Sequence, residues 1–362
     1  MSESYSLDIR SAHKNYSVRI GYGLLEEVIE DPLKIFLVDA RLKNLYPSLC
    51  RDRAVYVEAL ENNKTLETVA LLIEKLRDQG AQRTSHIVAV GGGIIQDLAT
   101  FVASSYMRGI TWTYCPTTLL GMVDSCIGGK SSINVGKYKN IAGNFYPPEN
   151  IIVDPVFCQS LPSMQRVEGL CEAVKICYAS SDGAFEAYLR LADVHNLIED
   201  IKAQEEIIEL SLKTKKVFIE EDEFDHGIRL LLNFGHTFGH AVEAASAFQI
   251  SHGIAVGLGM IAALHFSEAH GFVQNRNSRI RSLMKHISGL LRQVPDLKAH
   301  VQSLSSSLAA EKFISDKKHR DGSFVVIAFN DNGHLERRFV PSTKESLASV
   351  ERVFESLKSL PL

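Results

Sequence analysis

Apolar runs alternate with helical patterns through roughly the first 150 residues. Between two such runs, TLETVALLIEKLRDQG (65–80) has apolar residues at helical spacing and ends on a glycine. Buried strands are predicted at KIFLVD (34–39), SHIVAVGGG (85–93), TWTYCPTTLL (111–120) and NIIVDPVF (150–157). Strands that alternate with helices indicate a parallel sheet with helices on both faces.

After about residue 158, long helical patterns replace the strands. They are SMQRVEGLCEAVKICYA, AQEEIIELSLKTKKVFIEED and GIAVGLGMIAALHFSEAHG. A late segment, GSFVVIAFNDNGHLERRFV (322–340), has the alternation and the turn residues of a β-hairpin. A chain of 362 residues is long enough for two domains. We predict an α/β, Rossmann-like domain over 1–158 and a mainly α-helical domain over 159–362, with a hinge near Pro155–Pro162.

Composition narrows the class of protein. The apolar fraction of 45% and the charged fraction of 23% are typical of a soluble globular protein, and a net charge of −4 gives no reason to expect a nucleic-acid partner. No signal-peptide core or membrane-length apolar stretch is present, so a cytoplasmic protein is expected. The six cysteines form no CxxC pair and are expected to be reduced. Metal binding by Cys171 and Cys177 stays an open alternative.

Three histidines lie in the segment LNFGHTFGHAVEAASAFQISHG (232–253). His236 and His240 are four residues apart and share one face of a helix, and His252 follows the end of that helix. A pair at this spacing with a distant third histidine is a metal-ligand pattern. In a chain with 13 histidines the spacing also arises by chance, so ordinary core or surface histidines remain the alternative.

A glycine run between a strand and a helix, in HIVAVGGGIIQDLATFVAS, predicts a phosphate cradle. Glycine lets the backbone approach a pyrophosphate, and the helix N-terminus supplies free N–H groups. Gly91-Gly92-Gly93 is not the GxGxxG fingerprint, and a tight turn without a ligand is the alternative. Asp39, at the end of an earlier strand, suits a ribose hydroxyl or serves as a turn or cap residue.

Two further stretches carry charged groups in unusual surroundings. DSCIGGKSSINVGKYKN (124–140) places lysines on a glycine-rich loop, which suits a phosphorylated substrate or is an exposed basic loop. In EGLCEAVK, Glu172 lies in an apolar stretch, where a carboxylate costs free energy unless it is paired or bound to metal. Glu172 is therefore the better ligand candidate, whereas Glu168 can be a solvated surface charge.

Together, the glycine run, the basic loop and the candidate metal ligands suggest an enzyme that uses a nicotinamide and a divalent metal on a phosphorylated polyol.

The combination resembles the sugar phosphate cyclases, the wider family of 3-dehydroquinate synthase, from about Asp39 to Gly322. The motifs that carry the resemblance are GGGIIQDLA, SYMRG, PTTLL, VDSCIGGK, KN, GLCEAVK, LNFGHTFGHAVEA, SHG and DKK, with the spaced pair Lys215 and Arg229. The resemblance implies a nucleotide-binding first domain and a metal- and substrate-binding second domain.

The resemblance also implies roles for individual residues. The zinc or cobalt ligands are Glu172, His236 and His252, and His240 contacts the substrate and assists proton movement. The NAD-side residues are Gly92, Gly93, Asp97, Thr117, Thr118, Asp124 and Lys130, with Asp39, Glu61 and Lys64 towards the adenosine. The residues beside cofactor and substrate are Lys139 and Asn140, and Lys130 also lies near the phosphate. The groups that hold the substrate are Lys175, Lys215, Arg229, Asn233 and either Lys317 or Lys318. Arg108 reaches the phosphate from a neighbouring subunit, which implies a homodimer.

The implied reaction turns a phosphorylated seven-carbon sugar acid, 3-deoxy-D-arabino-heptulosonate 7-phosphate, into a carbocycle. NAD takes a hydride from a ring hydroxyl, phosphate leaves by elimination, the hydride returns, and the ring closes by an aldol step. NAD is thus catalytic rather than consumed.

The chain departs from the family pattern at a few positions. Ile254 stands where the family has glutamate in HGEAV, and Gln96 and Thr100 stand where it usually has glycine. These changes suggest a divergent branch. The alternatives are a cyclase for another sugar phosphate, such as a 2-deoxy-scyllo-inosose or 2-epi-5-epi-valiolone synthase, an NAD-dependent polyol dehydrogenase, or an inactive binding paralogue. Lys215, Arg229, Asn233 and His240 favour the dehydroquinate-type substrate, because a bidentate arginine suits its carboxylate.

Overall fold

The computed structural model describes residues 4–31, 34–136, 138–180, 182–316 and 318–362. Lys137 of the basic loop and Lys317, one of the two substrate candidates, lie outside the described residues. The chain forms two compact units, Met1–Pro162 with His195–Glu223, and Ser163–Val194 with Phe224–Leu362. The sequence analysis predicted a domain border at 158/159, close to the division after Pro162. It assigned residues 195–223 to the second domain, whereas they belong to the first compact unit.

A seven-stranded sheet forms the centre of the first unit. Its strand order is β1 (Tyr5–Ile9), β2 (Tyr16–Ile20), β9 (Asn150–Val153), β6 (Thr111–Pro116), β5 (His86–Gly91), β3 (Ile35–Asp39) and β4 (Ala54–Val57). Only the edge strand β1 pairs antiparallel; the other pairs are parallel. β3 is buried along its whole length, as expected of a central parallel strand covered on both faces. The predicted α/β architecture is confirmed.

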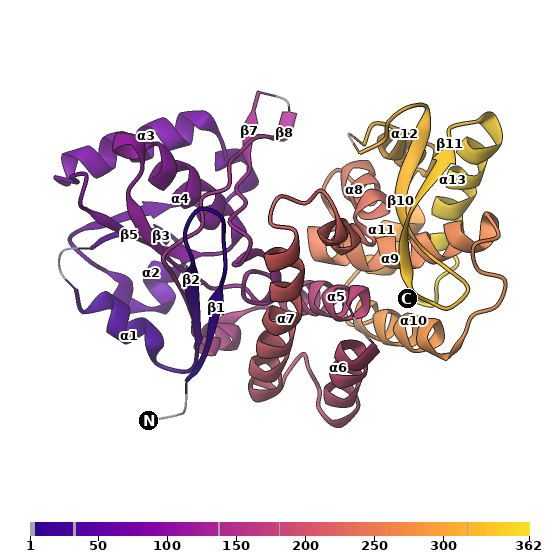
Figure 1. Ribbon diagram of the computed structural model, residues 1–362, viewed down its shortest axis with the longest axis horizontal. Coiled ribbons are helices and arrows are strands. Elements are labelled where there is room, and N and C mark those ends of the chain that lie inside the picture. Colours follow the sequence, from indigo (N-terminus) through magenta and orange to yellow (C-terminus); the bar gives the residue numbers. More distant parts are fainter. Residues whose placement is uncertain (1–3, 32–33, 137, 181, 317) are drawn as a thin grey trace. The chain divides into compact units, whose positions relative to one another are not determined.

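Helices cover this sheet. They are α1 (Leu24–Ile29), α2 (Leu42–Leu45), α3 (Leu66–Asp78) and α4 (Gly93–Ser105). In Figure 1, α3 and α4 lie along one side of the sheet and α1 and α2 along the other. The hydroxyl of Thr65 accepts a hydrogen bond from the backbone N–H of Thr68, which fixes the start of α3 one residue after the predicted start.

The glycine-rich stretch after β6 contains more regular structure than the predicted loop. It forms a π-helical turn, η4 (Gly121–Ser125), and a small hairpin of β7 (Ile133–Val135) and β8 (Tyr138–Ala142). The side chain of Asn134 stabilises this hairpin, because its oxygen accepts a hydrogen bond of 2.9 Å from the backbone N–H of Asn140. Short polar strands of this kind lack the apolar alternation that reveals a strand in a sequence.

Helix α7 (Ile201–Glu221) belongs to the first unit. The buried hydroxyl of Ser211 donates to the carbonyl of Val123, and the ammonium of Lys215 donates to the carbonyl of Ile127. These contacts join positions about ninety residues apart. A helical pattern fixes the element but not its tertiary partner, which is why the sequence grouped α7 with the later helices.

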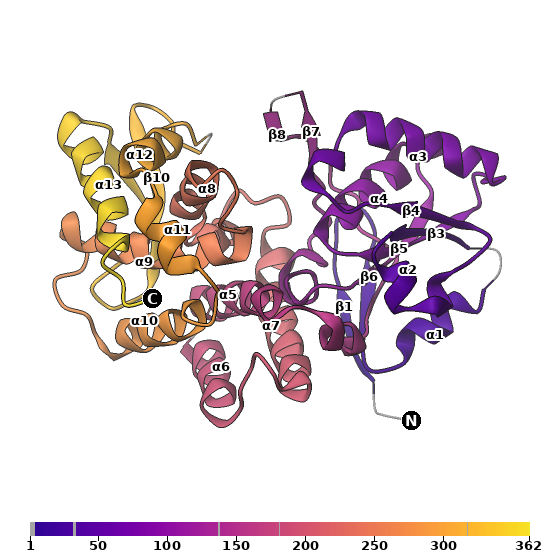
Figure 2. The same cartoon turned by 180° about the vertical axis from the view of Figure 1, so that it is seen from behind.

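The second unit is mainly helical, as predicted. Its helices are α5 (Ser163–Ala179), α6 (Asp182–Val194), α8 (His236–Ala245), α9 (His252–Ala269), α10 (Ser278–Leu291), α11 (Leu297–Ser303), α12 (Ser306–Ile314) and α13 (Lys344–Leu357), with a 3-10 segment η6 (Ile228–Asn233) before α8. The predicted hairpin is present as β10 (Ser323–Phe329) and β11 (Leu335–Pro341), seen from behind in Figure 2 beside α12 and α13. None of the helices in the described ranges is long and apolar enough to cross a membrane.

Candidate active site

Close helix packing in the second unit places the three histidines. A Cβ atom added at Gly259 of α9 would lie 2.0 Å from the carbonyl oxygen of Gly235 and 2.7 Å from the backbone nitrogen of Gly239 on α8. The two helices therefore approach closely only because glycine occupies this position. His236 begins α8 and His252 begins α9, so the close crossing of these helices brings both imidazoles together.

The predicted metal ligands converge on one point. Oε1 of Glu172 on α5 lies 3.8 Å from Nε2 of His236 and 3.5 Å from Nε2 of His252. Donor atoms that share a tetrahedral cation at ~2.1 Å lie about 3.4 Å apart, so the set is arranged as one carboxylate and two imidazoles around a divalent ion. The ring of His240 lies 5.4 Å from that of His236 and 5.6 Å from that of His252. The residues present fit zinc or cobalt.

Polar contacts on the far side of each ring set the orientation of the two candidate histidine ligands. Nδ1 of His236 lies 3.3 Å from the carbonyl oxygen of Phe234, and Nδ1 of His252 lies 3.3 Å from Oε2 of Glu243. Such contacts direct Nε2 towards a metal. Sequence analysis missed Glu243, although its spacing, three residues after His240 and seven after His236, places it on the same face of α8.

Burial and neighbouring charges shift the pKa values of the histidines in this cluster. Desolvation, with the nearby Lys175 ammonium, holds the pKa of His236 well below its usual value, which keeps a nitrogen lone pair available to a cation. Burial opposes protonation of His252, but its hydrogen bond to Glu243 and the charge of Glu172 raise its pKa above the usual value. The lowered pKa of His236 favours the neutral ring that binds a cation, whereas at His252 a cation competes with a proton.

Lys175 lies one helical turn from Glu172 on α5. Its ammonium is 2.5 Å from Oε2 of Glu172, and the two side chains are 2% and 1% exposed. Glu172 is thus paired, as its apolar surroundings require. Glu168 is not the solvated surface charge that the sequence allowed, because it is partly buried and desolvation raises its pKa. The backbone of Glu168 instead lies against Gly253 at the start of α9.

The phosphate cradle of the first unit lies at the end of β5. Helix α4 starts at Gly93, and its N-cap residue Gly92 has no side chain to occupy the first N–H groups of the helix. A Cβ at Gly91 would lie 2.4 Å from Ile95, and one at Gly92 would lie 3.0 Å from Thr118. The turn therefore leaves its backbone donors open in a space too narrow for a side chain, which fits a bound pyrophosphate.

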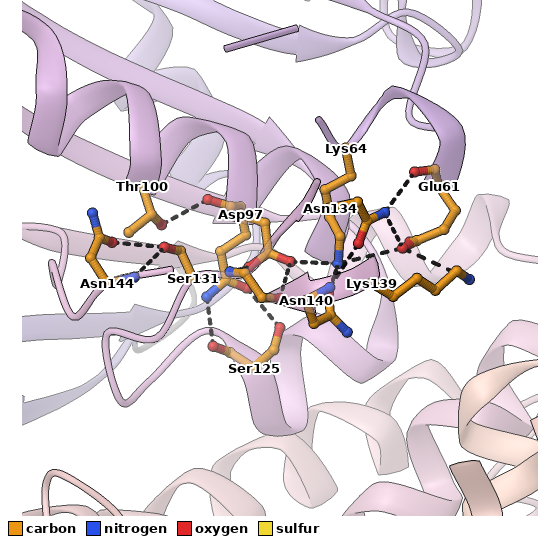
Figure 3. A network of polar contacts seen from close by, with 12 residues as sticks. Glu61, Lys64, Asp97, Thr100, Ser125, Ser131, Asn134, Lys139, Asn140 and Asn144 are labelled. Atoms are coloured by element: carbon orange, nitrogen blue, oxygen red, sulfur yellow. Dashed lines mark hydrogen bonds and ion pairs between the residues drawn. The ribbon is translucent and has the colours of Figure 1, made fainter. Parts of the chain in front are cut away.

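Beside this turn, several of the predicted cofactor residues form one polar network (Figure 3). The buried ammonium of Lys64 donates to Oδ2 of Asp97 at 3.0 Å and to the side-chain oxygen of Asn140 at 2.8 Å. Oε1 of Glu61 lies 3.7 Å from the same ammonium and 4.0 Å from that of Lys139. Burial raises the pKa of Asp97, and the charge of Lys64 partly offsets this effect.

The remaining first-unit candidates are arranged differently. The ammonium of Lys215 lies 2.5 Å from Oδ1 of Asp124, so these two predicted residues form a pair. The carboxylate of Asp39 is 2.8 Å from Arg41, whose guanidinium also donates to both of its oxygens. Lys130 and Arg108 are both exposed. Thr117 is buried, and its backbone N–H donates to the carbonyl of Gly91 at 3.1 Å.

In the second unit, the predicted substrate residues lie on η6 and before β10. Arg229 is buried, with 4% of its surface exposed. Asn233 and Lys318 line one cavity of about 490 Å³ together with Thr237, the neighbour of His236. The structure therefore brings the substrate candidates Asn233 and Lys318 to the same hollow in the vicinity of the histidine cluster.

The structure gives physical roles to the departures from the family pattern. The side-chain amide of Gln96 donates to the carbonyl of Ser125 at 2.6 Å and its oxygen accepts from the hydroxyl of Ser125 at 2.7 Å. Gln96 therefore ties α4 to η4 rather than projecting into the cradle. The hydroxyl of Thr100 donates back to the carbonyl of Gln96. Ile254 is 1% exposed and packs as an ordinary core residue of α9.

Comparison with known proteins identifies the family of this chain. Residues 54–168 match the family described as 3-dehydroquinate synthase N-terminal, and residues 169–319 match 3-dehydroquinate synthase C-terminal. The 3-dehydroquinate synthase of Enterococcus faecalis is 36% identical over 299 residues, which cover 82% of this chain and 80% of the relative.

Solved structures share the fold. A 2-deoxy-scyllo-inosose synthase complexed with carbaglucose-6-phosphate, NAD+ and Co2+ superposes with a TM-score of 0.83 at 24% identity, covering 97% of this chain and 99% of that one. The 2-epi-5-epi-valiolone synthase of Streptomyces hygroscopicus, with NAD+ and Zn2+ bound, gives 0.81 at 24% identity with the same coverage.

Proposed function

Since the chain belongs to the 3-dehydroquinate synthase family, we propose that it converts 3-deoxy-D-arabino-heptulosonate 7-phosphate, or a close analogue, to a carbocycle with elimination of phosphate. The reaction uses catalytic NAD and a divalent metal. The observation that carries the proposal is the convergence of Glu172, His236 and His252, with the buried Lys175 beside them. An inactive paralogue would have no need of this costly buried charge cluster.

In this proposal, Glu172, His236 and His252 hold zinc or cobalt. A divalent cation at this position supplies Lewis-acid polarisation of a substrate oxygen and orients the neighbouring hydroxyls. The buried ammonium of Lys175 donates a hydrogen bond to a hydroxyl group of the substrate. His240, the exposed histidine of the cluster, assists proton transfer at the carbon next to the oxidised centre.

The turn from Gly91 to Gly93 and the N-terminus of α4 hold NAD, with Asp97, Lys64 and the neighbouring network on the cofactor side. NAD supplies a reversible hydride acceptor. Lys175, Lys215, Arg229 and Asn233 hold the carboxylate, hydroxyls and phosphate of the substrate, and Lys318 and Lys130 are further cations for it. Much of the rate enhancement then comes from positioning and electrostatics rather than from covalent chemistry.

We also propose that the active form is a homodimer in which Arg108 completes the phosphate site of a second copy. Arg108 is exposed and has a left-handed backbone with φ of 71°, next to Met107 with φ of 48°. Two successive non-glycine residues in this region store backbone strain, which is typical of a segment held for function. Complementation of an inactive Lys175→Ala chain by an inactive Arg108→Ala chain tests this, because a mixed dimer regains one intact site.

The substrate is tested by measuring kcat/KM for phosphate release from three compounds: 3-deoxy-D-arabino-heptulosonate 7-phosphate, sedoheptulose 7-phosphate and glucose 6-phosphate. We expect the sugar acid to be preferred, because its carboxylate is the partner of Arg229. Arg229→Lys should reduce the preference, since it removes the bidentate geometry but keeps the charge. A preference for either sugar phosphate without a carboxylate would refute the dehydroquinate-type substrate and identify another cyclase of the same fold.

A further inference from the structure

One face of the hairpin β10–β11 carries cationic side chains that the family resemblance does not assign. In the register of this hairpin, Ile327 lies opposite Arg337, and Val325 lies opposite Phe339. Side chains of directly paired residues point to the same face of a sheet, so these four residues share one face. Ile327, Val325 and Arg337 line the cavity of about 490 Å³ in the second unit.

A second arginine reaches this face from the segment before β10. Arg320 and Ser323 exchange two backbone hydrogen bonds of 3.2 and 2.9 Å across a tight turn. The central residues of this turn, Asp321 and Gly322, have φ of 53° and 68°, as a two-residue turn of type I′ requires. The backbone of Arg320 is therefore held in place, and its side chain also lines the cavity.

Both guanidinium groups pack on one aromatic ring. The guanidinium carbon of Arg320 lies 5.4 Å from the centroid of Phe339, and that of Arg337 lies 5.0 Å from it. Stacking on an aromatic ring fixes the plane of a guanidinium and orients its donors. Among the described residues, neither Arg320 nor Arg337 forms an ion pair with a carboxylate. Two like charges thus line one cavity and contact the same aromatic ring.

The other face of the same strand provides a contrast. Arg338 is not among the residues that line the cavity, and its guanidinium lies 2.6 Å from the carboxylate of Glu336, so its charge is neutralised within the protein. On the cavity side, Lys318 also lines the cavity, but its ammonium lies 3.6 Å from Oδ2 of Asp316 and is paired within the protein, and Asp225 is the carboxylate among the described lining residues. Arg320 and Arg337 therefore differ from Arg338 and Lys318 in having no carboxylate within ion-pair distance among the described residues.

We propose that Arg320 and Arg337 form a second anion-binding site of this chain, one that takes a phosphate or carboxylate group of a small molecule. The cavity volume lies in the range of small-molecule sites, about 300–1,000 Å³. Its apolar wall of Val325 and Ile327 accommodates the carbon skeleton to which the anionic group is attached. Guanidinium groups that are already fixed lose little entropy when they bind a planar or tetrahedral anion. The same cavity holds Asn233 and Lys318, so the anion is either a further group of the substrate, in which case the site rests on the proposed function, or belongs to a separate small molecule.

Protection from arginine modification tests the site residue by residue. The metal- and NAD-loaded protein is treated with phenylglyoxal, with and without saturating inorganic phosphate, and modification of each arginine is followed by peptide mass spectrometry. Phosphate should slow modification of Arg320 and Arg337 about tenfold and leave Arg338 unaffected. Equal rates with and without phosphate at Arg320 and Arg337 would overturn the proposal.

The Arg320→Ala variant separates direct protection from an effect transmitted from the neighbouring substrate residues. If the two arginines share one anion, this variant should lose the protection of Arg337. Protection of Arg337 that persists undiminished in Arg320→Ala would contradict a shared site. Steady-state kinetics of Arg320→Ala then show which molecule carries the anionic group. A raised KM with unchanged kcat in Arg320→Ala assigns the group to the substrate, and unchanged kinetics with lost protection assigns it to a separate metabolite.

Discussion

At the scale of single residues, the structure shows which carboxylate contacts His252 although Ile254 replaces the glutamate of the family. The family pattern has a glutamate at this position, where a carboxylate can support a histidine ligand. Ile254 is instead buried in the core of α9, and Glu243 of α8 contacts Nδ1 of His252. A carboxylate thus reaches the ring from a different helix. The sequence could not reveal this, because the contact depends on how closely α8 and α9 cross.

Replacing Glu243 by glutamine should weaken binding of cobalt and zinc about 10- to 100-fold, since the neutral amide is a poorer acceptor for the histidine ring. The affinity is measured by competition with a chromogenic chelator, which requires no turnover. The control is Glu268→Gln, a carboxylate of α9 that pairs with Arg276 at 2.6 Å, whose metal affinity should stay within about threefold of wild type. Equal losses in both variants would argue against a specific role for Glu243.

The cysteines give a second residue-scale prediction. Burial raises the pKa of Cys115 and of Cys126 to about 12, so the reactive thiolate is scarce at pH 8. Cys50 is exposed. A brief treatment of the native protein with iodoacetamide should therefore label Cys50 alone, as seen in the intact mass and in peptides. Rapid labelling of Cys115 or Cys126 under native conditions would contradict their burial.

At the scale of elements, local patterns were sufficient to predict most strands and helices. The run 34–39 became β3, the alternation in 322–340 became a hairpin, and the histidine segment became α8 followed by α9. The β7–β8 hairpin was missed because polar residues such as Asn134, rather than an apolar face, stabilise it. The tie between α4 and η4 was also missed, since the hydrogen bonds of Gln96 join residues 29 positions apart.

Gln96→Ala should destabilise the protein by about 1–3 kcal/mol, because it removes two hydrogen bonds and leaves polar groups of Ser125 without their partner. Thr100→Ala is the matched control on the same helix. It removes only a bond within α4 and gains helix propensity, so its change should stay within about 0.5 kcal/mol. Urea unfolding followed by circular dichroism measures both. Equal free energies of unfolding for Gln96→Ala and Thr100→Ala would show that the hydrogen bonds between Gln96 and Ser125 do not stabilise the protein.

At the scale of the whole molecule, the sequence predicted two regions but not the return of α7 to the first unit. The buried Lys215 explains this return, because its ammonium bonds to Asp124 and to the carbonyl of Ile127 near η4. Charge pairing across a long stretch of chain leaves no local pattern. The residues of the candidate site could be named from the sequence because they lie in short motifs that could be matched one by one, and their roles stay predictions.

The nucleotide cradle and the metal donors belong to different compact units. Removal of the metal with a chelator should therefore abolish turnover while the affinity for NAD changes by no more than about threefold. Isothermal titration with NAD before and after chelation measures this, and addition of cobalt should restore activity. Loss of NAD binding on chelation would show that the two sites are not independent.

The central claim is that NAD and a metal at Glu172, His236 and His252 act as catalysts of phosphate elimination. The most direct measurement is the amount of inorganic phosphate released from 3-deoxy-D-arabino-heptulosonate 7-phosphate per molecule of NAD. The account predicts many phosphates per NAD, with no accumulation of NADH, and no release in the presence of chelator or from Lys175→Ala. Stoichiometric NADH formation without phosphate, from protein that binds both metal and NAD, would contradict it and identify a dehydrogenase.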